Sequence, residues 1–92
     1  MGNKIMKQAI EDFKHYLAVE KDASAYTIDS YCRDLIQFTA FLSEVGMEDF
    51  RRVDVNSVKG FLGHLHKRKL KRSSIARKLS SIRAFFDYLL RK

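Results

Sequence analysis

The stretch that decides the fold is residues 67–83, KRKLKRSSIARKLSSIR, a basic run that leads into a helix. Ser73 or Ser74 offers the side-chain oxygen that caps the start of such a helix. From there an apolar residue recurs at steps of four, three, four and three, at Ile75, Leu79, Ile82, Phe86 and Leu89. This spacing places them on one face of an α-helix, and we expect that face to pack into a hydrophobic core.

The other side of the same helix is polar. Ser74, Arg77 and Ser81 follow one another at helical spacing, with Ser73 and Lys78 beside them. Short hydroxyl side chains let another chain approach the helix closely, while cations attract an anionic one. Nucleic-acid phosphate fits this pattern, and the alternative is an ordinary solvated basic face.

The distribution of charge favours the first interpretation. Residues 1–50 hold five basic and nine acidic residues, a net charge of −4, whereas residues 51–92 hold thirteen and two, a net charge of +11. Such asymmetry is typical of a protein that binds nucleic acid or an anionic membrane. The apolar face of the last helix has three other amphipathic segments to pack against, so we expect DNA rather than a membrane as the partner.

The remaining segments also show helical periodicity. Amphipathic patterns predict helices from about 4 to 20, from Ser24 or Thr27 to Gly46, and from an Asp54 cap to the basic run. No stretch alternates with the period of a strand, proline is absent, and the connections are short. The sequence therefore predicts an all-α, compact four-helix domain over residues 1–92, with crossed packing around the longest helix.

Residues of the kind used in catalysis and metal binding are few and scattered. His64 and His66 lie two positions apart, about 200° around a helix, and cannot share a metal from one face. Cys32 cannot form an internal disulfide and is expected to be a small, partly buried residue. With no Gly-rich phosphate loop, HExxH or GxSxG motif, we expect no catalytic residue, metal or cofactor. No secretory or membrane-spanning segment is present, which predicts a cytoplasmic protein.

Some aromatic residues leave two interpretations open. Tyr31 lies on an apolar stripe and is expected in the core, whereas Tyr26 can contact a sugar-phosphate chain or solvent. Phe85, with Tyr88 and Leu89, either forms a second apolar patch for another domain or simply broadens the core.

Two motifs carry a resemblance to a known family. They are Ser24-x-x-Thr27-Ile28-x-x-Tyr31-x-x-Asp34-Leu35-x-x-Phe38-x-x-Phe41-Leu42 and Ser74-Ile75-Ala76-Arg77-Lys78-Leu79-Ser80-Ser81-Ile82-Arg83-x-Phe85-Phe86-x-Tyr88-Leu89. From about Lys7 to Arg91 the chain resembles the amino-terminal core-binding domain of tyrosine recombinases, nearest to the Xer and phage-integrase branch. It departs from that pattern at Ala23 and Tyr26, where relatives often have Leu and Asn.

The resemblance implies a SAM-like domain that forms half of a clamp around duplex DNA, through its second and fourth helices. The DNA-facing candidates it implies are Thr27, Ser30, Arg33, Ser73, Ser74, Arg77, Lys78 and Ser81, with phosphate contacts from Lys69, Lys71 and Arg72. Partners would be double-stranded DNA, the carboxy-terminal catalytic domain of the same recombinase and neighbouring protomers. That catalytic domain lies beyond residue 92 in relatives, so the chain is expected to be non-catalytic by itself, and Tyr88 is not its nucleophile. A helical module that docks an acidic protein partner is the alternative.

Overall fold

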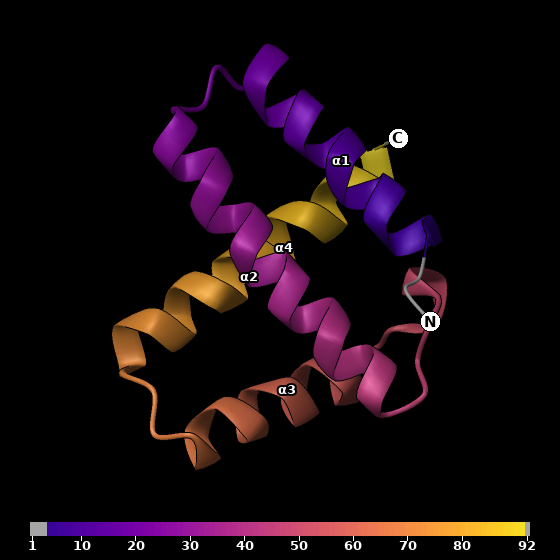
Figure 1. Cartoon of the computed structure of the whole chain (residues 1–92), viewed down its shortest axis with the longest axis vertical. Helices are drawn as coiled ribbons and strands as arrows, with labels where there is room; N and C mark the ends of the chain where they lie inside the picture. The colour runs from indigo at the N-terminus through magenta and orange to yellow at the C-terminus, as the bar shows by residue number, and fades with distance from the viewer. Residues whose placement is uncertain (1–3, 92) are drawn as a thin grey trace.

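The computed structural model describes residues 4–91, with side chains from Met6 onward. The chain forms four α-helices over this range, α1 (Lys4–Val19), α2 (Ala25–Glu44), α3 (Val55–Lys67) and α4 (Arg72–Arg91), with a single 3₁₀ turn, η1 (Phe50–Arg52), before α3 (Figure 1). No strand occurs among the described residues. The all-α prediction is therefore confirmed.

The helices pack as two crossed pairs. α1 and α2 run antiparallel, as do α3 and α4, and α2 passes across α4 near the centre of the molecule (Figure 1). The most extensive contact between helices is that of α2 with α4. The Cα radius of gyration is 12.8 Å, close to the ~12 Å expected for a compact chain of this length. Compact, crossed packing is thus observed as predicted.

Each helix contributes one fully buried phenylalanine to a shared core: Phe13, Phe38, Phe61 and Phe85. The rings of Phe13 and Phe85 are 5.3 Å apart, and those of Phe38 and Phe61 are 5.2 Å apart, both edge-on. Such pairs add about 0.5–1.5 kcal/mol each beyond the area they bury. These contacts hold α1 against α4 and α2 against α3.

The open question about Phe85 is answered by its burial. Phe85 has no exposed surface, and Tyr88 packs against the rings of Phe13 and Tyr16, at 5.4 and 4.7 Å. Both residues broaden the core rather than form a separate patch for another domain. On the predicted stripe, Ile75 is buried while Leu89 is only half-buried.

The expected caps at the starts of α2 and α3 are present, whereas the one expected for α4 is not. Ser24 caps α2 by accepting a hydrogen bond from the Thr27 amide at 3.1 Å, and Asp54 caps α3 through the Ser57 amide at 3.0 Å. The predicted serine cap of α4 is wrong, because that helix already begins at Arg72. The Ile75 amide bonds to the Lys71 carbonyl, so Ser73 and Ser74 lie inside the first turn of α4.

Candidate nucleic-acid interface

A polar stripe runs along the half of α2 that precedes its crossing with α4. Thr27, Ser30 and Asp34 are spaced by three and four residues and therefore share one face of the helix. Thr27 and Ser30 are half-buried, and the Asp34 side chain is completely buried. This stripe leads from the start of α2 to the point where α4 packs against it.

The Asp34 carboxylate accepts hydrogen bonds from two basic residues of α4. Arg77 donates from Nε to Oδ2 at 3.1 Å and from Nη2 to Oδ1 at 2.9 Å, while Lys78 donates from Nζ to Oδ1 at 3.0 Å. Ser81, one turn later, donates its hydroxyl to Oδ2 at 2.8 Å. We call Asp34, Gln37, Arg77, Lys78 and Ser81 the polar cluster, since Lys78 also donates to the Gln37 side chain.

Burial within the polar cluster corrects two predicted DNA contacts. Ser81 has no exposed surface and Lys78 is only 5% exposed. Both side chains point inward to Asp34, because a buried carboxylate must be hydrogen-bonded and paired with positive charge. Lys78 and Ser81 therefore support the crossing of α2 and α4 and are not placed to touch DNA directly.

The charge of Asp34 is maintained inside the fold. Burial by itself would raise the pKa of Asp34, but hydrogen bonds from Arg77, Ser81 and Lys78, together with the nearby Lys78 charge, outweigh it and hold that pKa below its ordinary value. The carboxylate therefore stays ionised at neutral pH.

Arg77 is the charged member of the polar cluster that reaches the surface, where Gln37 is exposed as well. Its side chain is 47% exposed although it pairs with a fully buried partner. The hydrogen bonds and charge of Asp34 raise the pKa of Arg77, and Tyr26 lies close enough to add to that rise. Because Asp34 lies on the same stripe of α2 as Thr27 and Ser30, Arg77 borders that stripe.

The other candidates from the basic stretch gather at the turn between α3 and α4 and at the start of α4. Lys69, Lys71, Arg72 and Ser73 are exposed, and Ser74 is half-buried. In Figure 1 the amino-terminal halves of α2 and α4 both extend to the same side of their crossing. Arg33, on α2, is exposed and pairs with Asp29 at 3.1 Å.

The turn itself is held by a two-bond helix-ending motif. The Lys69 amide bonds to the His66 carbonyl at 2.9 Å and the Leu70 amide to the Leu65 carbonyl at 3.4 Å. Lys69 consequently adopts φ 59°, a left-handed conformation that glycine normally takes. Leu70 is half-buried and packs against the core, so it anchors a loop whose cations face solvent.

Sequence reasoning did not single out Asp34 or Gln37 as parts of the site. Asp34 stands in the first of the two quoted motifs, directly before the core residue Leu35, but no role was assigned to it. A charged residue surrounded by apolar helical positions is the signal that could have identified it, since such a residue needs a partner from another element.

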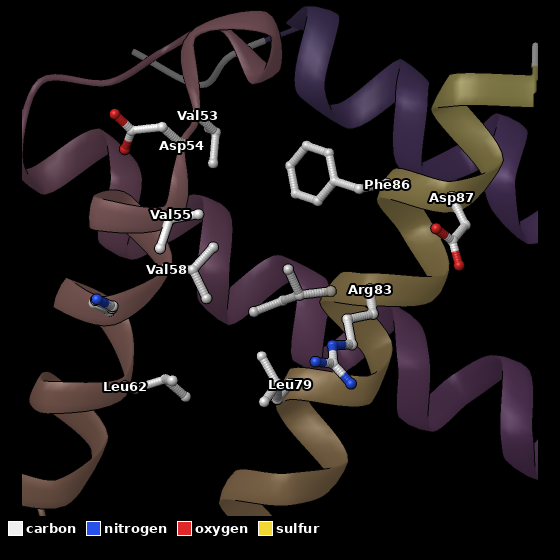
Figure 2. A pocket seen from close by; sticks show the side chains of 11 residues that line it. Val53, Asp54, Val55, Val58, Leu62, Leu79, Arg83, Phe86 and Asp87 are labelled. Carbon is white, nitrogen blue, oxygen red and sulfur yellow. The ribbon is translucent and has the colours of Figure 1, made fainter.

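A groove lies elsewhere, between α3 and α4 (Figure 2). Its lining is mainly aliphatic, including Val58, Leu62 and Leu79, with Arg83 and Asp87 from α4 beside it. Leu79 comes two residues after Arg77, about 200° around α4, so the groove and the polar cluster occupy different faces of that helix.

Other chemistry finds little support in residues 4–91. No group of three or more histidine, cysteine, aspartate or glutamate residues in this range is arranged to hold a metal ion. Burial raises the pKa of the Cys32 thiol, which disfavours the nucleophilic thiolate. His64 lies against the Phe41 ring at 5.4 Å as a packing residue. None of the helices in the described part of the chain is both long enough and apolar enough to cross a membrane.

Comparison with known proteins points to one family. The family model described as phage integrase, N-terminal SAM-like domain, matches residues 10–92. Among curated relatives, tyrosine recombinase XerC of Lacticaseibacillus casei is 47% identical over 89% of this chain, and that of Syntrophus aciditrophicus is 39% identical over 95%. XerC of Pseudomonas aeruginosa is 34% identical over 95%. No solved structure gives a significant match.

These matches cover only part of each relative. The chain spans 30% of the Syntrophus protein and 28% of the Lacticaseibacillus one. The family model nevertheless covers nearly the whole chain, and the predicted fold and both sequence motifs agree with it. This chain belongs to the family of N-terminal SAM-like domains of phage integrases and tyrosine recombinases.

Proposed function

We propose that this chain is a non-catalytic module that binds duplex DNA for a site-specific tyrosine recombinase. The observation that carries the proposal is Arg77, a half-exposed cation fixed where α2 crosses α4. Around it lie the hydroxyl stripe of α2 and the cations at the start of α4, while the net charge of residues 51–92 is +11. This combination fits a phosphate backbone that passes along the amino-terminal halves of both helices.

The proposed contacts fall into two groups. Along the helices they are Thr27, Ser30, Arg33, Ser73, Ser74 and Arg77, and at the turn before α4 they are Lys69, Lys71 and Arg72. Ser24 donates its hydroxyl to Thr27 at 3.0 Å, which leaves the Thr27 hydroxyl hydrogen free to donate to a phosphate. Contacts to phosphate set the position of the domain, and contacts to base edges set its sequence preference.

In this proposal residues 1–92 act as a core-binding domain and form one half of a clamp. The other half is the catalytic domain of the same recombinase. In support, the relatives are much longer than this chain, which spans 30% and 28% of two of them. Neighbouring protomers on DNA are further partners. Because half a clamp makes only part of the contacts, the isolated chain is expected to bind DNA weakly and to need low salt.

The test is a fluorescence anisotropy titration of a random-sequence duplex of about 30 base pairs over a series of salt concentrations. Four to six phosphate contacts predict a slope of roughly −4 to −5 in a plot of log affinity against log salt concentration. Polyglutamate of matched charge serves as the competitor, and we expect it to bind more weakly than the duplex.

A matched pair of double variants places the interface. Lys71→Ala with Arg72→Ala should reduce the slope by about two, whereas Lys7→Ala with Lys14→Ala removes the same charge from α1 and should leave it nearly unchanged. Equal effects of the two pairs would contradict an interface at the turn before α4. Tighter binding of polyglutamate would instead indicate a module that docks acidic proteins.

A further inference from the structure

The Arg77 guanidinium is only half used by the fold. It has five N–H groups in a fixed plane. The Nε hydrogen and one Nη2 hydrogen point to the two oxygens of Asp34, at 3.1 and 2.9 Å. Both Nη1 hydrogens and the second Nη2 hydrogen remain. One Nη1 hydrogen and the second Nη2 hydrogen are parallel and form the end edge of the guanidinium, a second fork of two donors.

This second fork belongs to the part of Arg77 that is open to solvent. The side chain is 47% exposed, while the carboxylate that holds its inner edge is fully buried. Ser73 and Ser74 precede it on the same helix, and their small side chains allow a close approach by another chain. A double-donor fork on a helix that can approach closely matches the O6 and N7 acceptors of guanine in the major groove.

The carboxylate is itself fixed from the opposite side. Lys78 donates to Oδ1 at 3.0 Å and Ser81 to Oδ2 at 2.8 Å, so each oxygen that binds Arg77 also binds a buried donor. Asp34 therefore cannot turn without breaking several hydrogen bonds. A phosphate accepts hydrogen bonds from many directions, whereas a guanine edge accepts two from one direction. A rigidly held fork favours the guanine.

We propose that Asp34 is a positioning residue, which fixes Arg77 so that its outer fork can read one guanine in the major groove. This inference depends on the proposed DNA-binding function. Asp34 acts only through Arg77, and Lys78 and Ser81 act by holding Asp34.

The test begins with in vitro selection of preferred duplexes from a random pool, using the whole chain at low salt. In the selected duplex each guanine is then replaced in turn by 7-deazaguanine, which lacks the N7 acceptor. We expect the affinity of the wild-type chain to fall about fivefold or more at one guanine and little elsewhere. A wild-type chain that binds the duplex without any such dependence would overturn the proposed reading of guanine.

Two variants separate positioning from charge. Arg77→Lys keeps the positive charge but has no planar fork, so it should keep the salt slope and lose the 7-deazaguanine effect. Asp34→Asn should reduce that effect, and should have no additional influence on it in the Arg77→Lys background. Retained N7 dependence in Arg77→Lys, or undiminished dependence in folded Asp34→Asn, would refute the inference.

A milder change covers the case in which Asp34→Asn does not fold. Ser81→Ala removes one hydrogen bond to the Asp34 oxygen that accepts from Arg77 Nε, while both charges of the pair remain. Ser81→Ala should reduce the loss of affinity caused by 7-deazaguanine more than it reduces the affinity for the unmodified duplex. An unchanged 7-deazaguanine effect would contradict positioning by Asp34. If the wild-type chain binds no duplex at all, the proposed function fails, and the result is distinguishable from a failure of the positioning inference.

Discussion

Asp34 and Lys78 are separated by 44 positions in the sequence, yet their charged atoms lie 3.0 Å apart inside the molecule. Their side chains are 0% and 6% exposed. Since a buried charge is tolerated only when it is paired, this contact fixes how α2 and α4 cross. The same carboxylate holds Arg77 at the surface, so stability and the proposed DNA contact share one group.

Loss of the carboxylate should destabilise the fold strongly. Asp34→Ala leaves the Lys78 ammonium buried without its charge partner, and we expect the free energy of unfolding to fall by about 3–5 kcal/mol. The control is Asp29→Ala, which breaks the exposed pair with Arg33 and should cost under about 1 kcal/mol. Urea denaturation followed by circular dichroism measures both. Similar losses in the two variants would show that the buried pair does not hold the crossing.

The stability should also depend on pH in the acid range. The lowered pKa of Asp34 means that the unfolded chain takes up a proton at a higher pH than the folded one. The contribution of the Asp34 carboxylate to the free energy of unfolding is complete above the ordinary aspartate pKa of about 3.9. That contribution is lost as the pH falls through the lower pKa of the folded state.

The measurement is a set of denaturation curves between pH 7 and pH 2 for the wild type and Asp34→Asn. The wild-type free energy of unfolding should decrease more steeply below about pH 4 than that of Asp34→Asn. Asp49, which caps η1 by accepting from the Arg51 amide, and Asp54 also have lowered pKa values. The variant should therefore keep part of the slope. Parallel curves would exclude Asp34 as a source of the acid sensitivity.

The backbone at Lys69 predicts opposite effects on stability and binding. Lys69→Gly relieves a left-handed conformation at φ 59° and should raise the free energy of unfolding by about 1 kcal/mol. The loss of its charge should reduce the salt slope of duplex binding by about one. Lys69→Ala is the matched variant, since it removes the charge and keeps the strain.

Gly46 supplies the reverse control. It occupies the same position after α2, at φ 81°, with its amide bonded to the Ser43 carbonyl at 3.1 Å. A Cβ there would meet no atom within 4 Å, so Gly46→Ala tests backbone strain alone and should lose about 1 kcal/mol. Equal stability of Lys69→Gly and Lys69→Ala would contradict the role of strain.

The cap of α2 makes a separate prediction. Ser24→Ala removes the acceptor for the Thr27 amide and should lower the free energy of unfolding by about 1 kcal/mol. Ser24→Asp keeps an acceptor and should retain most of the stability. Thermal denaturation compares the two, and an equal decrease in both would argue against capping by Ser24.

Much of the fold was predictable because its signals are local. The spacing of apolar residues predicted the helices, and Asp54 and Gly46 marked helix ends through hydrogen bonds within a few residues. The prediction of a cap at Ser73 or Ser74 was wrong. Lys69 and Leu70 end α3 in a tight turn, and α4 therefore starts already at Arg72. That turn depends on Leu70 packing against the core, which a local pattern does not contain.

By itself the sequence determined the four helices, the basic character of the second half and the presence of Arg77 on a polar face. Only the tertiary structure decided that the neighbouring Lys78 is an internal residue and that Asp34 is its partner. The periodicity of a helix gives the direction of each side chain about its own axis. Which directions become interior depends on where α2 crosses α4, and that crossing brings together residues more than 40 positions apart.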